Sequence, residues 1–343
     1  MSDISVRIEG KAGRITLTRP KALNALSYDM VLAIEAALDR WRDDPAVALL
    51  ILDAEGDKAF CAGGDIAELH ATGMAGDFAY GRRFWSDEYR MNAKLAEFPK
   101  PVVALMQGFT MGGGVGLGCH AGYRIVDAST RIAMPECGIG LVPDVGGSLL
   151  LARAPGRLGD YLGTTAGRME AGDAIFAGFA DHLIPRDRWA GLVAALCDSA
   201  DLSLLEADSE AFPQGPLSAQ LEQIDALFAG DGLADILATL RANDSDFASA
   251  TLKTLMRNSP LAMACTVEMI RRLRAGGADI RQALAQEYRF TFRAMEHGDF
   301  LEGIRAQIID KDRNPRWKHA IDGIGQDEAA AMLAPLGPDE LTF

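Results

Sequence analysis

The chain has 343 residues, of which 49% are hydrophobic and 24% are charged, and its formal net charge is −14 at pH 7. This length and apolar content allow a substantial hydrophobic core, in one large domain or two ordinary ones. The acidic balance argues against nucleic acid or an anionic membrane surface as a partner, although a local basic patch could still hold one anionic ligand.

The cysteines are scattered without a CxxC pair, at Cys61, Cys119, Cys137, Cys197 and Cys265. This pattern predicts reduced, mostly buried thiols and argues against a disulfide scaffold or a zinc ribbon. The histidines are equally dispersed and form no HExxH motif, so we expect no metal. The first residues alternate as a strand without a secretory or transit pattern, and no run of about 18 apolar residues occurs. We therefore expect a cytoplasmic, soluble protein.

The first part of the chain predicts alternating strands and helices. Residues 4–9 and 14–18 alternate about "GKAG" as a β-hairpin. Ser27 is a suitable N-cap for a helix that runs to about Trp41. Further buried strands are predicted by continuous apolar runs at residues 47–54, 101–108 and 123–128. This alternation favours an α/β fold.

The pattern changes in the second half of the chain. From about residue 145 the sequence predicts successive amphipathic helices, and the region from about residue 200 shows almost no strand signal. We therefore predict a core domain at residues 1–199, which carries the functional site, and a helical region at residues 200–343.

Two glycine-rich segments each follow a predicted strand, "FCAGGDI" at residues 60–66 and "MGGGVGLGCH" at residues 111–120. Glycines there let backbone N–H groups approach a ligand, and two such groups aimed at one point form an oxyanion hole. Tight turns and close helix packing are the simpler explanation for either segment.

A dinucleotide-binding fold is a rival interpretation of the second glycine segment. Gly116, Gly118 and Ala121 satisfy GxGxx(G/A), and Glu136 lies twenty positions beyond the first of them. The match is weak, because residues 112–114 already occupy the turn after the strand and Glu136 follows a proline.

The stretch "MPECGIGLVPDVGG" at residues 134–147 holds two carboxylates, Glu136 and Asp144. Its backbone is too rich in glycine and proline for a helix, and its side chains are too apolar for an exposed loop. Either the acids serve a chemical function, or they cap helices and pair with Arg131 or Arg153.

These segments resemble the crotonase (enoyl-CoA hydratase/isomerase) superfamily and, more narrowly, its 3-hydroxyisobutyryl-CoA hydrolases. The matching stretches cover nearly the whole chain: "NALS" (24–27), "FCAGGDI", "FTMGGGVGL" (109–117), "MPECGIGLVPDVGG" and "DFLEGIRAQIIDKDRNPRW" (299–317). The last two are specific to the hydrolase branch. The resemblance implies a crotonase-like ββα spiral with a helical C-terminal region that covers the acyl pocket and packs on neighbouring subunits, consistent with a homo-oligomer.

The resemblance also implies roles for particular residues. The amides of Gly64 and Gly113 would form the oxyanion hole around a thioester carbonyl, and Glu136 and Asp144 would be the catalytic pair. Glu88 would contact the substrate together with Gly113 and the two acids, although its charged neighbours alone favour a solvated helix face. Coenzyme A would be bound by Lys21, Ala22, Leu23, Ala25, Asp65 and Ile66. No cofactor is implied, because coenzyme A is part of the substrate.

One departure from the hydratases bears on the reaction. Hydratases carry two glutamates; this chain has Gly116 where one of them stands, and Asp144 where hydratases commonly have glycine. The resemblance therefore implies that water is delivered to a carbonyl. The expected reaction is hydrolysis of a short β-hydroxyacyl-CoA, with 3-hydroxyisobutyryl-CoA of valine breakdown as leading substrate. Glu136 would attack the carbonyl to give an anhydride or activate a water, while Asp144 orients the hydroxyl and handles protons.

Two alternatives remain open. Gly116 disfavours a hydratase or isomerase, and the two loop acids disfavour a non-catalytic CoA-binding protein. Basic residues near the end could attract the phosphates of coenzyme A or could simply pair with Glu302 and Asp310: they are Arg305, Lys311, Arg313, Arg316 and Lys318. Lys21 is the better candidate for coenzyme A.

Overall fold

The computed structural model describes residues 3–212 and 214–343. The chain groups into two compact units, and each draws on three separate segments of the sequence. The first unit comprises Met1–Gly64, Arg90–Ala133 and Arg168–Ser218, and the second comprises Asp65–Tyr89, Met134–Gly167 and Ala219–Phe343. This grouping differs from the division that we predict between residues 199 and 200. A change in periodicity marks where strands give way to helices, whereas long-range packing decides which segments cluster.

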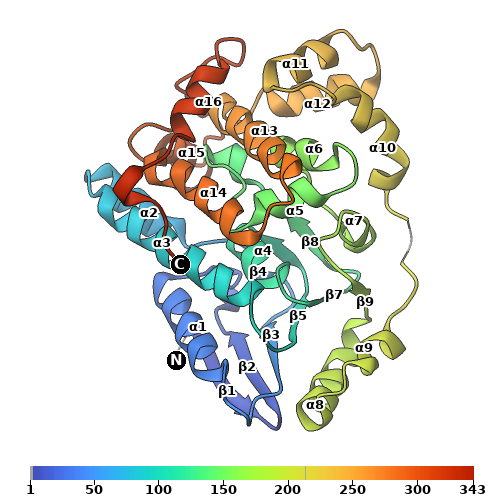
Figure 1. Ribbon diagram of the computed structural model, residues 1–343. Coiled ribbons are helices and arrows are strands. Elements are labelled where there is room, and N and C mark those ends of the chain that lie inside the picture. Colours follow the sequence, from blue (N-terminus) through green and yellow to red (C-terminus); the bar gives the residue numbers. More distant parts are fainter. Residues whose placement is uncertain (1–2, 213) are drawn as a thin grey trace. The chain divides into compact units, whose positions relative to one another are not determined.

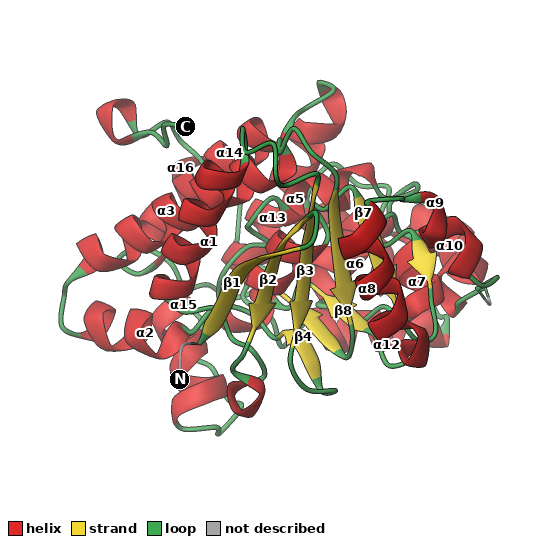
Figure 2. Ribbon diagram, turned by 90° about the horizontal axis from the view of Figure 1, so that it is seen from below, coloured by secondary structure: helices red, strands yellow, loops and turns green. Residues whose placement is uncertain are grey.

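A six-stranded sheet forms the centre of the first unit, in the order β1-β2-β3-β5-β7-β9. Its strands are β1 (Ile4–Glu9), β2 (Ala12–Leu17), β3 (Leu49–Ala54), β5 (Val102–Met106), β7 (Tyr123–Val126) and β9 (His182–Leu183). β1 and β2 form the predicted antiparallel hairpin, and the remaining neighbours are parallel. Figure 2 shows β1, β2 and β3 side by side. The predicted buried strands are therefore confirmed within one or two residues at each end.

A second, three-stranded parallel sheet in this unit is not predicted from the sequence. It consists of β4 (Ala59–Cys61), β6 (Phe109–Met111) and β8 (Arg131–Ala133). The two glycine-rich segments begin where β4 and β6 end. Each strand has three residues, which is too short to produce a recognisable alternation.

The helices of the first unit cover the sheet and extend its core. They are η1 (Pro20–Ala22), α1 (Tyr28–Trp41), α4 (Gly113–Gly118), α7 (Ala171–Phe176), η3 (Arg186–Arg188), α8 (Trp189–Ser199) and α9 (Ser203–Asp208). α1 begins and ends as predicted, and the Ser27 hydroxyl accepts the N–H of Met30 at 3.4 Å. Leu49, Ile51 and Trp189 belong to one buried cluster that joins β3 to α8. Each fully buried side chain of this kind contributes about 1.5–3 kcal/mol.

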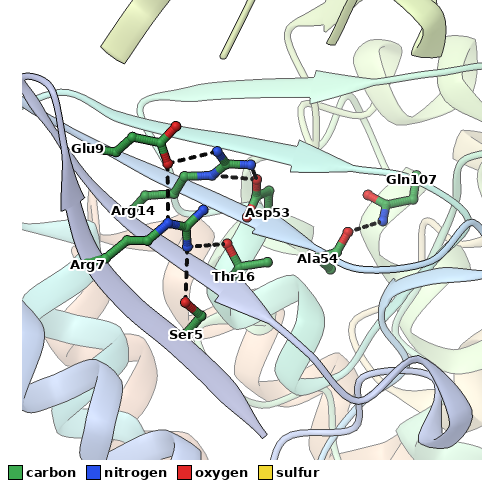
Figure 3. A network of polar contacts seen from close by, with 8 residues as sticks. All are labelled: Ser5, Arg7, Glu9, Arg14, Thr16, Asp53, Ala54 and Gln107. Carbon is green, nitrogen blue, oxygen red and sulfur yellow. Dashed lines mark hydrogen bonds and ion pairs between the residues drawn. The ribbon is translucent and has the colours of Figure 1, made fainter. Parts of the chain in front are cut away.

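Polar side chains of β1, β2 and β3 form a network of contacts (Figure 3). Arg14 of β2 contacts Asp53 of β3 at 2.6 Å and Glu9 of β1 at 3.0 Å. Arg7 of β1 donates to the hydroxyl of Thr16 at 3.0 Å. Alternation along the strands places Arg14 and Thr16 on the face that also carries Ala12. The network ties the first three strands together where the helices leave them partly exposed.

The second unit is helical. It contains α2 (Ile66–Met74), the first part of α3 (Phe78–Ala96), η2 (Glu136–Ile139), α5 (Gly147–Arg153), α6 (Leu158–Thr165), most of α10 (Pro216–Leu227), α11 (Leu233–Arg241), α12 (Asp246–Leu255), α13 (Pro260–Ala275), α14 (Ile280–Ala294), α15 (Phe300–Ile304), η4 (Arg305–Ile309), α16 (Gln326–Met332) and η5 (Gly337–Asp339). α13 and α14 pack against α5 (Figure 1). The Asp279 carboxylate accepts the N–H of Gln282 at 2.9 Å and so starts α14.

Two expectations from composition can be compared with these elements. All five cysteines are free and buried, as predicted. Among the described helices, none combines the length and the apolar character that crossing a membrane requires.

Candidate active site

The loop at residues 134–147 buries both of its acids. Glu136 starts η2 and is 4% exposed, and Asp144 is 5% exposed. The loop turns sharply at Gly140, Val145 and Gly146, whose φ angles are 74°, 52° and 79°. A positive φ is unusual for a β-branched residue such as Val145. The acids are therefore held inside the second unit by an uncommon backbone path.

The arginines that could have explained these acids have other partners. Arg131 pairs with Glu170 at 3.0 Å, and Arg153 donates to the carbonyl of Ala278 at 3.2 Å. Pairing of the loop acids with these two arginines is therefore contradicted.

Helix α3 brings two further polar side chains into the second unit's interior. Glu88 is 3% exposed, so the solvated position that its charged neighbours favour is wrong. The next residue, Tyr89, donates its hydroxyl to Oδ2 of Asp144 at 2.7 Å. A buried carboxylate that accepts this bond is stabilised in its charged form.

The three acids interact electrostatically. Burial raises the pKa of Asp144 from 3.8 to about 6, although the Tyr89 hydroxyl and a backbone N–H oppose this rise. Burial and then the charge of Asp144 raise the pKa of Glu88 well above its usual value. The pKa of Glu136 is raised by the same two causes, in the same order. When Asp144 ionises, Glu88 and Glu136 therefore hold their protons more tightly.

One oxygen of Glu136 stands apart from the rest of this cluster. Its Oε2 is buried and has no hydrogen-bond partner within the described residues. Leaving a buried carboxyl oxygen unpaired is costly, and such atoms often mark a site where a water or a ligand binds. Glu136 therefore has an oxygen available for chemistry.

The sequence interpretation missed a fourth buried acid, Glu287 on α14. It is 0% exposed and accepts hydrogen bonds from the N–H groups of Gly146 at 2.8 Å and Ser148 at 3.1 Å. Burial raises its pKa to about 8. A signal was present: Glu287 lies three residues after Leu284 and three before Phe290, on the apolar stripe of the helix.

The glycines assigned to the oxyanion hole both lie in the first unit. Gly113 is the first residue of α4, where N–H groups have no acceptor inside the helix. Gly64 follows β4, and the preceding Gly63 carbonyl accepts the N–H of Leu26 at 2.9 Å. Neither Gly64 nor Gly113 donates its N–H to a backbone carbonyl in the described part of the chain. Both amides therefore have the local setting that the assignment requires.

Close helix packing explains another glycine of the same segment. A Cβ added to Gly114 would lie 2.2 Å from the carbonyl oxygen of Cys61, so only glycine allows this close approach of α4 to β4. The dinucleotide interpretation is contradicted, because Gly116 and Gly118 lie inside α4 and not in the turn before it.

The segment assigned to coenzyme A is tightly shaped in the first unit. Leu23 and Asn24 have φ angles of 53° and 55°. The Asn24 side chain donates to the carbonyls of Glu55 and Ala59 at 3.0 and 2.9 Å. The N–H of Ala62 donates to the carbonyl of Leu23 at 3.0 Å.

These bonds place the coenzyme A segment directly beside the strand end that leads to Gly64. Lys21 and Ala22 are exposed and Ala25 is half-buried there. The last two assigned residues belong to the second unit, where Asp65 is the N-cap of α2 and Ile66 its first residue.

Two of the C-terminal basic residues, Arg305 and Lys318, have local partners. Arg305 contacts Glu302, Asp310 and Asp312 at 2.8, 2.6 and 2.7 Å, and Lys318 donates to the carbonyl of Glu296 at 3.3 Å. For Arg305 the pairing with Glu302 and Asp310 is confirmed.

Comparison with known proteins gives the family. The family model for enoyl-CoA hydratase/isomerase matches residues 12–333. The 3-hydroxyisobutyryl-CoA hydrolase, mitochondrial, of Xenopus tropicalis is 39% identical over 345 residues, which are 97% of this chain and 89% of the relative. The 3-hydroxyisobutyryl-CoA hydrolase 1 of Arabidopsis thaliana is 35% identical over 92% of this chain and 87% of its own.

Two solved structures superpose on the whole chain. An enoyl-CoA hydratase from Rhodobacter sphaeroides 2.4.1 is 59% identical with a TM-score of 0.96, and the match covers 100% of both chains. A carnitinyl-CoA dehydratase from Mycobacterium thermoresistibile is 40% identical with a TM-score of 0.94, covering 100% of this chain and 99% of the other. The predicted α/β fold of crotonase type is thereby confirmed. The chain belongs to the enoyl-CoA hydratase/isomerase family.

Proposed function

We propose that this protein hydrolyses a short β-hydroxyacyl-CoA thioester, and that its substrate is 3-hydroxyisobutyryl-CoA, which yields 3-hydroxyisobutyrate and free coenzyme A. The substrate is taken from the curated relatives named above. One observation carries the reaction type: two carboxyl groups, Glu136 and Asp144, are buried in one loop, and Glu136 keeps an unpaired oxygen. Hydrolysis of this thioester would place the protein in valine breakdown.

Glu136 has two routes to the thioester. Its carboxylate can attack the carbonyl carbon, so that the C–S bond breaks, coenzyme A leaves as a thiolate that takes up a proton, and water then cleaves the anhydride. It can instead accept a proton from a water that attacks the carbonyl directly. In both routes negative charge develops on the carbonyl oxygen, and we assign the amides of Gly64 and Gly113 to stabilise it.

We assign Asp144 to the substrate's 3-hydroxyl group and to proton transfer. With a pKa raised to about 6, it can both accept and release a proton near neutral pH. Glu88, which is buried and whose pKa is raised by burial and by the charge of Asp144, would contact the acyl group.

Coenzyme A is bound, in this proposal, by Lys21, Ala22, Leu23, Ala25, Asp65 and Ile66. The protein uses no cofactor beyond the coenzyme A of its substrate. We also propose a cytoplasmic location, supported by five free, buried thiols, and assembly into a homo-oligomer. The animal relatives carry the word mitochondrial in their names. The proposed location is therefore tested separately, by cell fractionation.

A hydratase is the second candidate, because the solved structure that is 59% identical is an enoyl-CoA hydratase. Position 116 argues against it. Gly116 lies inside the buried helix α4, where the hydratase reaction would need a second glutamate.

A thiol-release assay over a panel of acyl-CoAs decides between the candidates. The panel contains 3-hydroxyisobutyryl-CoA, 3-hydroxybutyryl-CoA, isobutyryl-CoA and crotonyl-CoA. We expect thiol release, fastest with the first compound. Loss of crotonyl-CoA absorbance without thiol would support the hydratase, and tight binding of coenzyme A with no turnover would support a binding protein.

A further inference from the structure

Glu287 anchors the loop that carries Asp144. Its Oε2 accepts the N–H of Gly146 at 2.8 Å, and its Oε1 accepts the N–H of Ser148 at 3.1 Å. The hydroxyl of Ser148 donates to the same Oε1. Gly146 lies two residues after Asp144 and is the N-cap of α5. A single side chain of α14 therefore binds both sides of the point where the loop enters the helix.

The loop needs an anchor of this kind. Val145 and Gly146 have φ angles of 52° and 79°, and a β-branched residue in this region of backbone space is strained. Such a conformation persists only where surrounding contacts impose it. The bonds from Glu287 hold the N–H of Gly146 inside the turn and the N–H of Ser148 just after it, so they restrain the backbone that follows Asp144.

Burying a carboxyl group between helices costs free energy, because the group loses its hydration. An apolar side chain would pack there without this cost. Its own helix supplies an alternative kind of anchor one residue earlier, where the neutral Gln286 donates to the carbonyl of Met269 at 3.2 Å. A carboxyl group at position 287 has two oxygens that accept hydrogen bonds from the loop, and when ionised it carries a charge that acts on Glu136. These two properties explain an acid at this position.

We infer that Glu287 is a positioning residue, which holds the Asp144 loop in its working conformation and contributes its charge to the field at Glu136. The inference rests on the proposed roles of Asp144 and Glu136. The titratable groups that face Glu287 are Tyr89 of α3, Glu136 of η2 and Asp144, and Glu88 adjoins them through Asp144.

The charge of Glu287 has a defined direction of effect. When ionised, it raises the pKa of Glu136. Because burial raises the pKa of Glu287 to about 8, this charge is present only above about pH 8. A neutral replacement therefore changes the kcat profile only in that range, where Glu136 then ionises more readily. A purely structural anchor would not change the profile in that range alone.

The test compares Glu287→Gln, Glu287→Asp and wild type in the full-length protein, with 3-hydroxyisobutyryl-CoA between pH 5 and 9. In Glu287→Gln an amide NH₂ replaces one acceptor and faces an N–H donor. We expect kcat to fall by about tenfold to a hundredfold with little change in KM, and the kcat profile to change its form only above about pH 8. Glu287→Asp keeps the charge but is shorter, so kcat should fall while the profile above about pH 8 keeps its wild-type form.

Gln286→Ala is the matched control, because it removes a buried side-chain bond from the same helix without touching the loop. It should unfold more easily but keep the kcat and pH profile of wild type. Hydrogen exchange of residues 142–150 supplies a readout that does not depend on turnover. Exchange should accelerate in Glu287→Gln and not in Gln286→Ala.

The outcomes separate the two proposals. A wild type that releases no thiol overturns the proposed function, and loop exchange still decides the anchoring role. A Glu287→Gln variant with wild-type kcat, pH profile and loop exchange overturns the inference and leaves the proposed function standing.

Discussion

The hydroxyl of Tyr89 donates a 2.7 Å hydrogen bond to Oδ2 of Asp144, across 55 positions of sequence. This bond favours the charged form of Asp144 and opposes the effect of burial on its pKa. Tyr89 is itself fully buried, so the bond is shielded from water, and hydrogen bonds to charged groups in such settings contribute about 1.5–3 kcal/mol.

Tyr89→Phe should raise the pKa of Asp144 above about 6. If the ionised form of Asp144 is the active one, activity at pH 6 falls more than activity at pH 8, and the acid limb of the kcat profile moves to higher pH. Tyr80→Phe is the control, because Tyr80 lies on the same helix and donates to an exposed carboxylate, Glu68, also at 2.7 Å. Equal profiles for the two variants would exclude this role for Tyr89.

Glu136→Gln should keep the shape of the loop and remove the nucleophile or base, so kcat falls far more than KM rises. Multiple turnovers of wild type in water enriched in heavy oxygen then separate the two routes. An anhydride leaves label in the Glu136 peptide, whereas direct attack by water leaves none. Glu206→Gln, on the exposed face of α9, is a surface control that should change neither rate nor labelling.

Asp144→Gly should weaken discrimination between 3-hydroxyisobutyryl-CoA and isobutyryl-CoA. A buried polar group left unpaired is what rejects a ligand that lacks the hydroxyl. The measured quantity is the ratio of the two kcat/KM values, with Asp144→Asn as a variant that keeps hydrogen bonding but loses charge. An unchanged ratio would assign hydroxyl recognition to another residue, and Glu88 would be tested next.

Gly113→Pro deletes one N–H at the first position of a helix, where proline is well tolerated. If that N–H belongs to the oxyanion hole, transition-state stabilisation should fall by about 2.7–4 kcal/mol. Asp246→Pro makes the same change at the start of the exposed helix α12 and controls for the substitution itself. Normal kcat in a folded Gly113→Pro protein would disprove the assignment.

Much of the fold follows from local signals in the sequence. Ser27 caps α1 as expected, and the apolar runs became β3, β5 and β7 because strands buried on both faces need no alternation. The short strands β4, β6 and β8 could not be predicted, because pairing with each other defines them more than their own three residues do.

The site was only partly predictable for a related reason. Glu136 and Asp144 were recognisable because an acid is out of place in an apolar, glycine-rich loop. Glu88 lies on an amphipathic helix among charged neighbours, and only long-range packing shows that it is buried. Glu287 also lies on an amphipathic helix, but helical periodicity could have identified it, since it interrupts an apolar stripe.

The bond between Gly146 and Glu287 joins residues that are 141 positions apart. At a synthesis rate of about 5–20 residues per second, the loop is synthesised roughly 7 to 28 s before its anchor. During that interval the strained turn lacks its bonds to Glu287, and a nascent chain cannot complete its acid cluster. A message truncated before codon 287 would therefore produce a chain that retains Glu136 and Asp144 but lacks the contact that holds their loop.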